Sequence, residues 1–210
     1  MILKKAILLS GLFYFILLFS SGFSEADDSK VNEPTDTKWA VTLFNGIYTN
    51  RTIGKALLNI PGDFEQNYMH ALALSRKIWE SERHFSFELE GMVAKHHGKH
   101  ETGRQNYEEY TLAMLLRYHT FPWNKHLNTS VAVGEGFSLT SKTPKLELQS
   151  YEGKSQKFLN YLAIELTLTL PKYPNVSLCY RIHHRSGVFG TFGGVKGASD
   201  FYLLGLRYRF

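Results

Sequence analysis

The sequence predicts an all-β protein, an eight-stranded antiparallel transmembrane β-barrel of the outer-membrane type. Apolar and polar residues alternate from Trp39 onward, which is the pattern of strands with one apolar face. Eight segments carry this alternation, and each is near the ~9 to 11 residues of a tilted membrane strand. Their connections alternate between short and long, as the periplasmic turns and outer loops of such barrels do.

The residues before the barrel form two parts. Lys4 and Lys5 precede an apolar run that ends at Phe19, and small residues then flank Phe23. This pattern is typical of a secretory signal, which we expect to be cleaved after Ser24. We therefore expect a signal peptide over residues 1–24, a polar N-terminal segment over 25–37 and the barrel over 38–210.

Composition limits the classes of function. With 43% hydrophobic and 20% charged residues, the chain is too apolar to be disordered. Removing Lys4 and Lys5 from the 24 basic residues leaves 22 against 19 acidic ones, and a net charge of +3 gives no support to nucleic-acid binding. Cys179 is the only cysteine in the sequence, which excludes an intramolecular disulfide. The sequence implies no cofactor.

The strands and connections have bounds that the alternation sets. The strands are predicted over 38–49, 67–79, 84–95, 107–120, 128–139, 159–170, 176–186 and 200–210. The short connections are 80–83, 121–127 and 171–175, and the long ones are 50–66, 96–106, 140–158 and 187–199. Trp39, Trp79 and Trp123 all fall at strand ends on the expected periplasmic side, as an aromatic girdle would. The terminal Phe210 resembles the signature by which the barrel assembly machinery recognises such chains.

Parity separates two faces in strands three, four, six and eight. The sixth strand, for example, places Leu162 and Ile164 outward and Glu165 inward. Inward charges of both signs recur on these strands, at Glu88, Glu90, Arg117, Glu165, Arg207 and Arg209. Because side chains fill the interior of an eight-stranded barrel, we expect a buried ionic network and no open pore. Arg76 and Glu135 fall on outward positions, for which the alternation gives no account.

Polar residues interrupt the lipid-facing series of the seventh strand. That series is apolar from Val176 to Ile182 and then continues to His184 and Ser186. The outward series of the antiparallel eighth strand begins with Asp200, so an acid, a histidine and a serine converge on the outer wall. An imidazole can take the proton of a serine hydroxyl, and a carboxylate can orient that imidazole. The opposite parity of His183 directs it inward, away from this group.

The stretch from Tyr180 to Gly187, followed by a C-terminal Leu-Arg-Tyr-Arg-Phe, resembles the lipid A 3-O-deacylase (PagL) family. The resemblance implies an outer-membrane esterase that removes the ester-linked acyl chain at the 3-position of lipid A. It also implies that His184 is the base and Ser186 the nucleophile. The glutamate of the family falls on Asp200 when counted back from the chain end, and on Ala198 when counted forward from the serine.

This chain departs from the family at two positions. Asp200 stands where the family has glutamate, and its side chain is one methylene shorter. The asparagine that usually follows the serine, and is thought to assist the oxyanion, is replaced by Gly187. A backbone N–H can also stabilise a developing oxyanion, so Gly187 is the expected donor.

Two alternatives stay open at the level of the sequence. His184 and Ser186 can be ordinary rim residues of a non-enzymatic barrel with a structural, adhesive or lipopolysaccharide-binding role. A second cluster, in the predicted loop 96–106 and just before it, consists of Lys95, His96, His97, Lys99, His100 and Arg104. It lacks a carboxylate or thiolate at a fixed spacing, so we expect attraction of lipopolysaccharide phosphates rather than a metal site.

The expected partner is therefore lipid A or lipopolysaccharide in the outer leaflet, and the expected location is the bacterial outer membrane. The sequence leaves open whether the barrel forms a homodimer.

Overall fold

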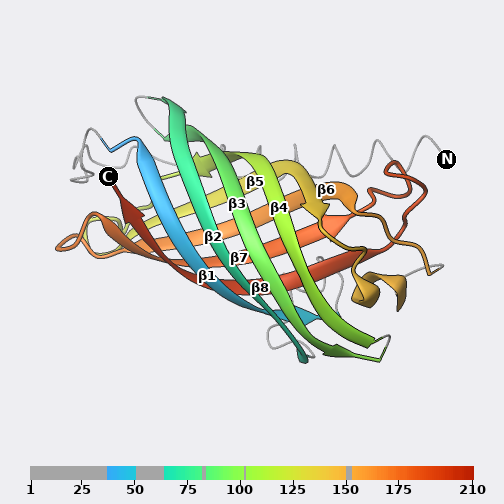
Figure 1. The fold of residues 1–210 in the computed structure, drawn as a ribbon. Helices are drawn as coiled ribbons and strands as arrows, with labels where there is room; N and C mark the ends of the chain where they lie inside the picture. The colour runs from blue at the N-terminus through green and yellow to red at the C-terminus, as the bar shows by residue number, and fades with distance from the viewer. Residues whose placement is uncertain (1–36, 51–63, 82–83, 102, 150–152) are drawn as a thin grey trace. The chain divides into compact units, whose positions relative to one another are not determined.

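The computed structural model describes residues 37–50, 64–81, 84–101, 103–149 and 153–210. Within these ranges, eight antiparallel strands close into one barrel, in which each strand pairs with its neighbour in the chain and β8 pairs with β1 (Figure 1). The predicted fold class is confirmed. The expected signal peptide lies outside the described residues, as does the polar segment up to residue 36. No helix in the described part of the chain has the length and hydropathy to cross a membrane.

The strands keep the predicted order, and most bounds lie within a few residues of those predicted. They are β1 (Trp39–Thr49), β2 (Phe64–Glu80), β3 (Phe85–His100), β4 (Gly103–Tyr118), β5 (Asn128–Thr140), β6 (Phe158–Thr169), β7 (Val176–Ser186) and β8 (Ala198–Arg209), with a short 3-10 helix η1 (Lys145–Gln149) between β5 and β6. The predicted long loop over 96–106 is wrong, because β3 and β4 continue to a tight hairpin at His100 and Gly103. Polar residues occupy both faces of these extensions, so hydropathy carries no period-two signal there.

The two ends of the barrel differ in their connections (Figure 1). The turn end, as we call it, carries the short connections and the joined ends of β1 and β8, where the Phe210 N–H donates to the Trp39 carbonyl at 2.9 Å. Trp79 and Trp123 lie exposed at this same end, together with Trp39. The Arg76 guanidinium lies 5.3 Å from the centre of the Trp39 ring, which accounts for its outward position. The opposite, loop end carries η1 and the β7–β8 connection.

The outer wall between the two ends is apolar. Large hydrophobic side chains are exposed on every strand, including Leu43, Leu72, Leu89, Leu112, Val133, Phe158, Leu178 and Leu206. Most of the residues between them on each strand point inward and are buried. A continuous apolar belt of this kind marks a surface that contacts lipid rather than water.

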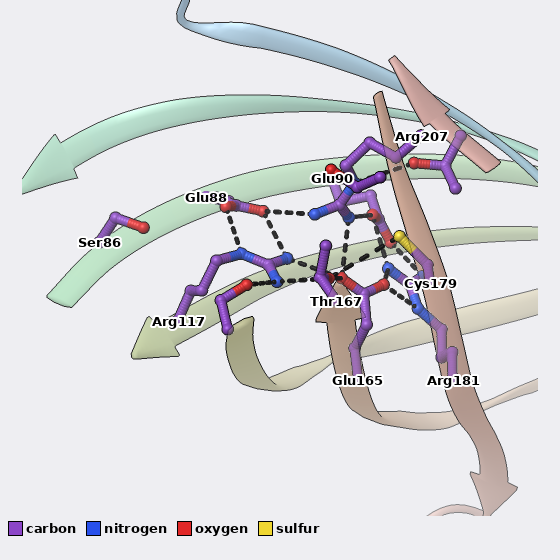
Figure 2. Close-up of polar contacts among 12 residues, drawn as sticks. Ser86, Glu88, Glu90, Arg117, Glu165, Thr167, Cys179, Arg181 and Arg207 are labelled. Atoms are coloured by element: carbon purple, nitrogen blue, oxygen red, sulfur yellow. Dashed lines mark hydrogen bonds and ion pairs between the residues drawn. The ribbon is translucent and has the colours of Figure 1, made fainter. Parts of the chain in front are cut away.

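An ionic network fills the middle of the barrel (Figure 2) and joins the five strands β3, β4, β6, β7 and β8. It connects three glutamates to three arginines, namely Glu88, Glu90, Glu165, Arg117, Arg181 and Arg207. Glu165 is its centre, because its carboxylate accepts hydrogen bonds from Arg117 and Arg181, each at 2.8 Å, and lies 3.0 Å from Arg207. The predicted network is therefore confirmed.

Bidentate pairs surround this centre. Arg117 donates to both oxygens of Glu88 at 2.6 and 3.0 Å, and Arg181 donates to both oxygens of Glu90 at 2.6 and 2.9 Å. Two parallel hydrogen bonds fix the planar guanidinium in both distance and orientation. Cys179 is buried beside the network, as its inward parity predicts.

The loop end is closed from inside by η1, which inserts Leu146 and Glu147 into the barrel. Both side chains are buried, and the Glu147 carboxylate accepts hydrogen bonds from Arg185 at 2.5 and 2.7 Å. The Ser199 hydroxyl on β8 also donates to Glu147, at 2.8 Å. The β5–β6 connection is therefore tied to the ends of β7 and β8.

We predict that Glu165→Gln destabilises the folded barrel by about 3 to 5 kcal/mol, because three buried guanidinium groups would then share two carboxylates. The measurement is equilibrium unfolding in urea of the protein refolded into lipid vesicles. Glu80→Gln is the control, since it breaks an exposed pair with Lys77 and should cost no more than about 1 kcal/mol. Equal losses for the two variants would contradict a stabilising role for the interior pairing.

Candidate active site

The register between β7 and β8 places His184 directly opposite Asp200, and Ser186 opposite Ala198. The His184 Nδ1 atom lies 2.7 Å from Oδ1 of Asp200, so the contact predicted between them is present. Directly opposed residues of an antiparallel pair have Cβ atoms about 4.5 to 5.5 Å apart. An aspartate is therefore long enough to reach the ring.

The hydrogen bond fixes which nitrogen of His184 remains available. An ionised carboxylate only accepts, so Nδ1 carries the proton that is donated to Asp200. The neutral ring then holds its lone pair on Nε2, which points away from Asp200. This is the tautomer that a general base needs.

Ser186 shares the outward face of β7 with His184, and its side chain is partly exposed. Its hydroxyl makes no hydrogen bond with the His184 ring in the described structure, although both residues lie on the wall where the sequence predicts that they converge. Residues two apart on a strand are roughly 6.5 Å apart at Cα, which is within reach of both side chains. Because the hydrogen bond is absent in this conformation, contact between Ser186 and Nε2 requires a different rotamer of at least one side chain. The other two members are more buried, with side-chain exposures of 12% for His184 and 4% for Asp200.

The connection after Ser186 folds back tightly on β7. A Cβ atom on Gly187 would lie 2.0 Å from the Val195 carbonyl oxygen, so a larger residue does not fit here. The Gly187 N–H donates to the Gly197 carbonyl at 3.3 Å, and the predicted oxyanion donor is therefore occupied in this conformation. Val188 and Phe189 adopt left-handed φ values of 47° and 55°, an uncommon conformation for such residues that marks local strain.

Two further polar residues lie on the same outer wall, and sequence reasoning missed their relation to the site. Glu135 on β5 is in register with His184 through Leu162, and Asn160 on β6 lies directly opposite Ser186. The Asn160 amide donates to the Glu135 carboxylate and, at 3.1 Å, to the Gly136 carbonyl. Asn160 has the outward parity of Leu162, so its position was available as a signal in the sequence.

The remaining histidines of the sequence analysis separate into two groups. His183 points inward, as predicted, and together with His96 contacts the buried Glu109 carboxylate at 3.1 and 2.7 Å. His97 points outward and stacks on His70, with ring centres 5.0 Å apart. The expectation that His96 and His97 act together in one loop cluster is therefore wrong, because their strand parities are opposite. Within the described ranges, no group of three or more His, Cys, Asp or Glu residues is placed to hold a metal ion.

Comparisons with known proteins extend the description of the fold. No protein-family model matches the chain, and no curated protein matches its sequence. Among solved structures, the outer membrane enzyme PagL is similar over 80% of this chain and 99% of its own, with 12% identity and a TM-score of 0.54. Neisserial surface protein A is similar over 82% of this chain and 97% of its own, with 11% identity and a TM-score of 0.50. Both are outer-membrane barrels, and at these identities the likeness shows the fold alone.

We predict that Gly187→Ala displaces the connection between β7 and β8, because the added methyl group collides with the Val195 backbone. Limited proteolysis with chymotrypsin should then cut faster at Phe189, by at least about tenfold if the packing costs 1.4 kcal/mol or more. Gly91→Ala is the matched control, since a Cβ atom there meets nothing within 4 Å. Unchanged cleavage in Gly187→Ala would contradict the tight packing at this position.

Proposed function

We propose that this protein is an outer-membrane esterase that removes an ester-linked acyl chain from lipid A, with Ser186 as nucleophile, His184 as base and Asp200 as the orienting acid. The observation that carries the proposal is the 2.7 Å hydrogen bond between His184 and Asp200 on the outer wall. The His184 ring lies on the same outward face of β7 as Ser186, at a place where a barrel of this type normally presents apolar residues.

The first half of the reaction forms an acyl enzyme. The His184 Nε2 atom takes the Ser186 proton while Oγ attacks the ester carbonyl carbon, and the carbonyl electron pair moves onto its oxygen. Collapse of this intermediate breaks the bond to the sugar oxygen, which leaves with the proton from Nε2. Asp200 stabilises the imidazolium that exists between these two proton transfers.

The second half releases the fatty acid. A water molecule gives a proton to Nε2 as its oxygen attacks the acyl carbon, and the bond to Ser186 Oγ then breaks with return of the proton to Oγ. Both halves need a donor for the oxyanion. Gly187 can supply it when substrate replaces its long 3.3 Å hydrogen bond to Gly197.

The outward position of the site supports a substrate that arrives from the side. The apolar wall continues to Leu162, a partly exposed residue that lies directly opposite His184 on β6. An acyl chain lying along this wall would remain in hydrocarbon while its ester reaches Ser186. The filled interior offers no comparable route, since the side chains of Arg117 and Arg181 are almost completely buried there.

A basic face near the loop end supports lipopolysaccharide as the partner. We use this name for Lys95, His97, Lys99 and Arg104, which are exposed on the outward sides of β3 and β4. Of these four described residues, Lys95 forms an ion pair, with the carboxylate of Glu108. Exposed cations just beyond an apolar belt attract the phosphates of anionic lipids.

A non-enzymatic barrel is the second candidate. The observation that favours it is the missing hydrogen bond between Ser186 and His184, which leaves the serine hydroxyl without an activating base in this conformation. In that case the basic face would account for lipid binding, and the polar outer wall would be an interfacial rim. Activity measurements on single variants separate the two candidates.

We predict that Ser186→Ala lowers the rate of lipid A deacylation by at least about 10³-fold, and that His184→Asn has a similar effect. Asp200→Asn should lower the rate of deacylation by a smaller factor, because the His184 base remains but loses the carboxylate that orients it. The readout is mass spectrometry of lipid A after incubation with protein refolded in detergent micelles.

Ser177→Ala is the control for these variants, since Ser177 lies on the same strand but points inward and bonds Thr169 at 2.7 Å. It should retain the wild-type rate. Identical acyl patterns for the wild type and Ser186→Ala would refute the esterase and leave the non-enzymatic barrel.

We predict that reversing two charges of the basic face, in Lys99→Glu with Arg104→Glu, raises the dissociation constant for lipopolysaccharide at least about tenfold. The matched control reverses Lys125 and Lys172, which lie in connections at the turn end. Binding to the detergent-solubilised protein is measured by titration calorimetry at low and high salt. Equal affinities for the two double variants would contradict a role for the basic face.

A further inference from the structure

Glu135 is a carboxylate on the outer wall of β5, where its register neighbours Met114 and Leu162 are apolar. A charged residue facing lipid is destabilising by an amount that depends on its depth, so such a position needs an explanation. Glu135 is also close enough to His184 for the two groups to interact electrostatically. The acid therefore belongs to the surroundings of the candidate active site.

The hydrogen bonds of Asn160 define the orientation of its side chain. Both of its Nδ2 hydrogens are directed toward β5, one to the Glu135 carboxylate and one to the Gly136 carbonyl. Because the amide group is planar, its Oδ1 atom then lies on the side away from β5, which is the side of β7 and Ser186. No described residue donates a hydrogen bond to this oxygen.

An acceptor beside the nucleophile cannot bind the ester itself, since an ester group has no hydrogen-bond donor. It can bind a donor on the sugar carbon next to the esterified one, and a lipid-facing acceptor left without a donor disfavours substrates that lack this group. The Asn160 side-chain oxygen is not among the buried side-chain atoms that lack a partner, so a ligand on the outer wall can reach it. An amino sugar acylated on nitrogen beside an esterified hydroxyl carries such a donor, its amide N–H.

We propose that Asn160 is a specificity-determining residue that accepts a hydrogen bond from the amide N–H beside the scissile ester, and that Glu135 is the positioning residue that holds it. This inference rests on the proposed esterase and narrows its substrates to N-acylated amino sugars. Glycerophospholipids and purely ester-linked glycolipids lack the donor and are cleaved more slowly.

The test compares two synthetic substrates with equal chains: a 2-N-acyl-3-O-acyl glucosamine and a 2,3-di-O-acyl glucose, in which oxygen replaces the N–H group. The wild type should hydrolyse the 3-ester of the amide substrate with a kcat/KM at least about tenfold higher, the ratio expected from one additional hydrogen bond to the substrate. Asn160→Ala and Glu135→Leu should bring this ratio close to one.

Two further variants and a folding assay complete the design. Glu135→Gln keeps a carbonyl oxygen that can accept from Asn160, so it should preserve most of the ratio. Asn45→Ala should preserve all of it, since Asn45 is an outward asparagine that bonds His70 on the β1–β2 pair. The heat-dependent shift in gel mobility of the barrel verifies that each variant is folded.

The outcomes distinguish the inference from the proposed function. A wild-type ratio of one, or an unchanged ratio in folded Asn160→Ala, overturns the inference and leaves the esterase standing. A wild type that hydrolyses neither substrate overturns both. A ratio lost in Asn160→Ala and Glu135→Leu but kept in Glu135→Gln and Asn45→Ala supports it.

Discussion

The pairing of Glu165 with three arginines is the constraint on which the rest of the barrel depends. Eight strands leave an interior that side chains must fill, and the alternation that gives the outer wall its apolar belt sends the charged residues inside. A buried guanidinium without a carboxylate is strongly destabilising, so the strands that carry these groups have to meet in one register. A shift of one residue in β6 or β7 would expose Glu165 or Arg181 to lipid.

Strand β7 shows how this interior constraint reaches the outer wall. Arg185 lies between His184 and Ser186 in the chain, and its guanidinium points inward to Glu147 and to the carbonyls of Gln156 and Lys157. The same strand segment is therefore clamped from inside while it presents His184 and Ser186 outside. Rigid elements hold reactive groups more accurately than free loops do. The inward contacts of Arg185 therefore fix the backbone that carries His184 and Ser186 on the outer face of β7.

The fold could be predicted from the sequence because period-two alternation is a local signal. The contact between His184 and Asp200 could be predicted because strand parity and antiparallel pairing determine it. It failed for β3 and β4, where residues such as His96 and His97 are polar on both faces and erase the alternation. The role of Gly187 could not be predicted, since the packing of Val195 against it depends on the fold of the connection. The relation of Glu135 to Asn160 required the register between β5 and β6.

The polar residues of the candidate active site are grouped along the chain as well as in space. Glu135, Asn160, His184, Ser186 and Asp200 all lie on the four C-terminal strands, whereas the basic face lies on β3 and β4. The hydrogen bonds among these five residues lie within β5 to β8, but Asp200 also pairs with Thr49 of β1 across the seam between β8 and β1. A C-terminal half joined by recombination to a different N-terminal half would carry these hydrogen bonds with it, but it would still need a first strand that pairs with β8 at Asp200.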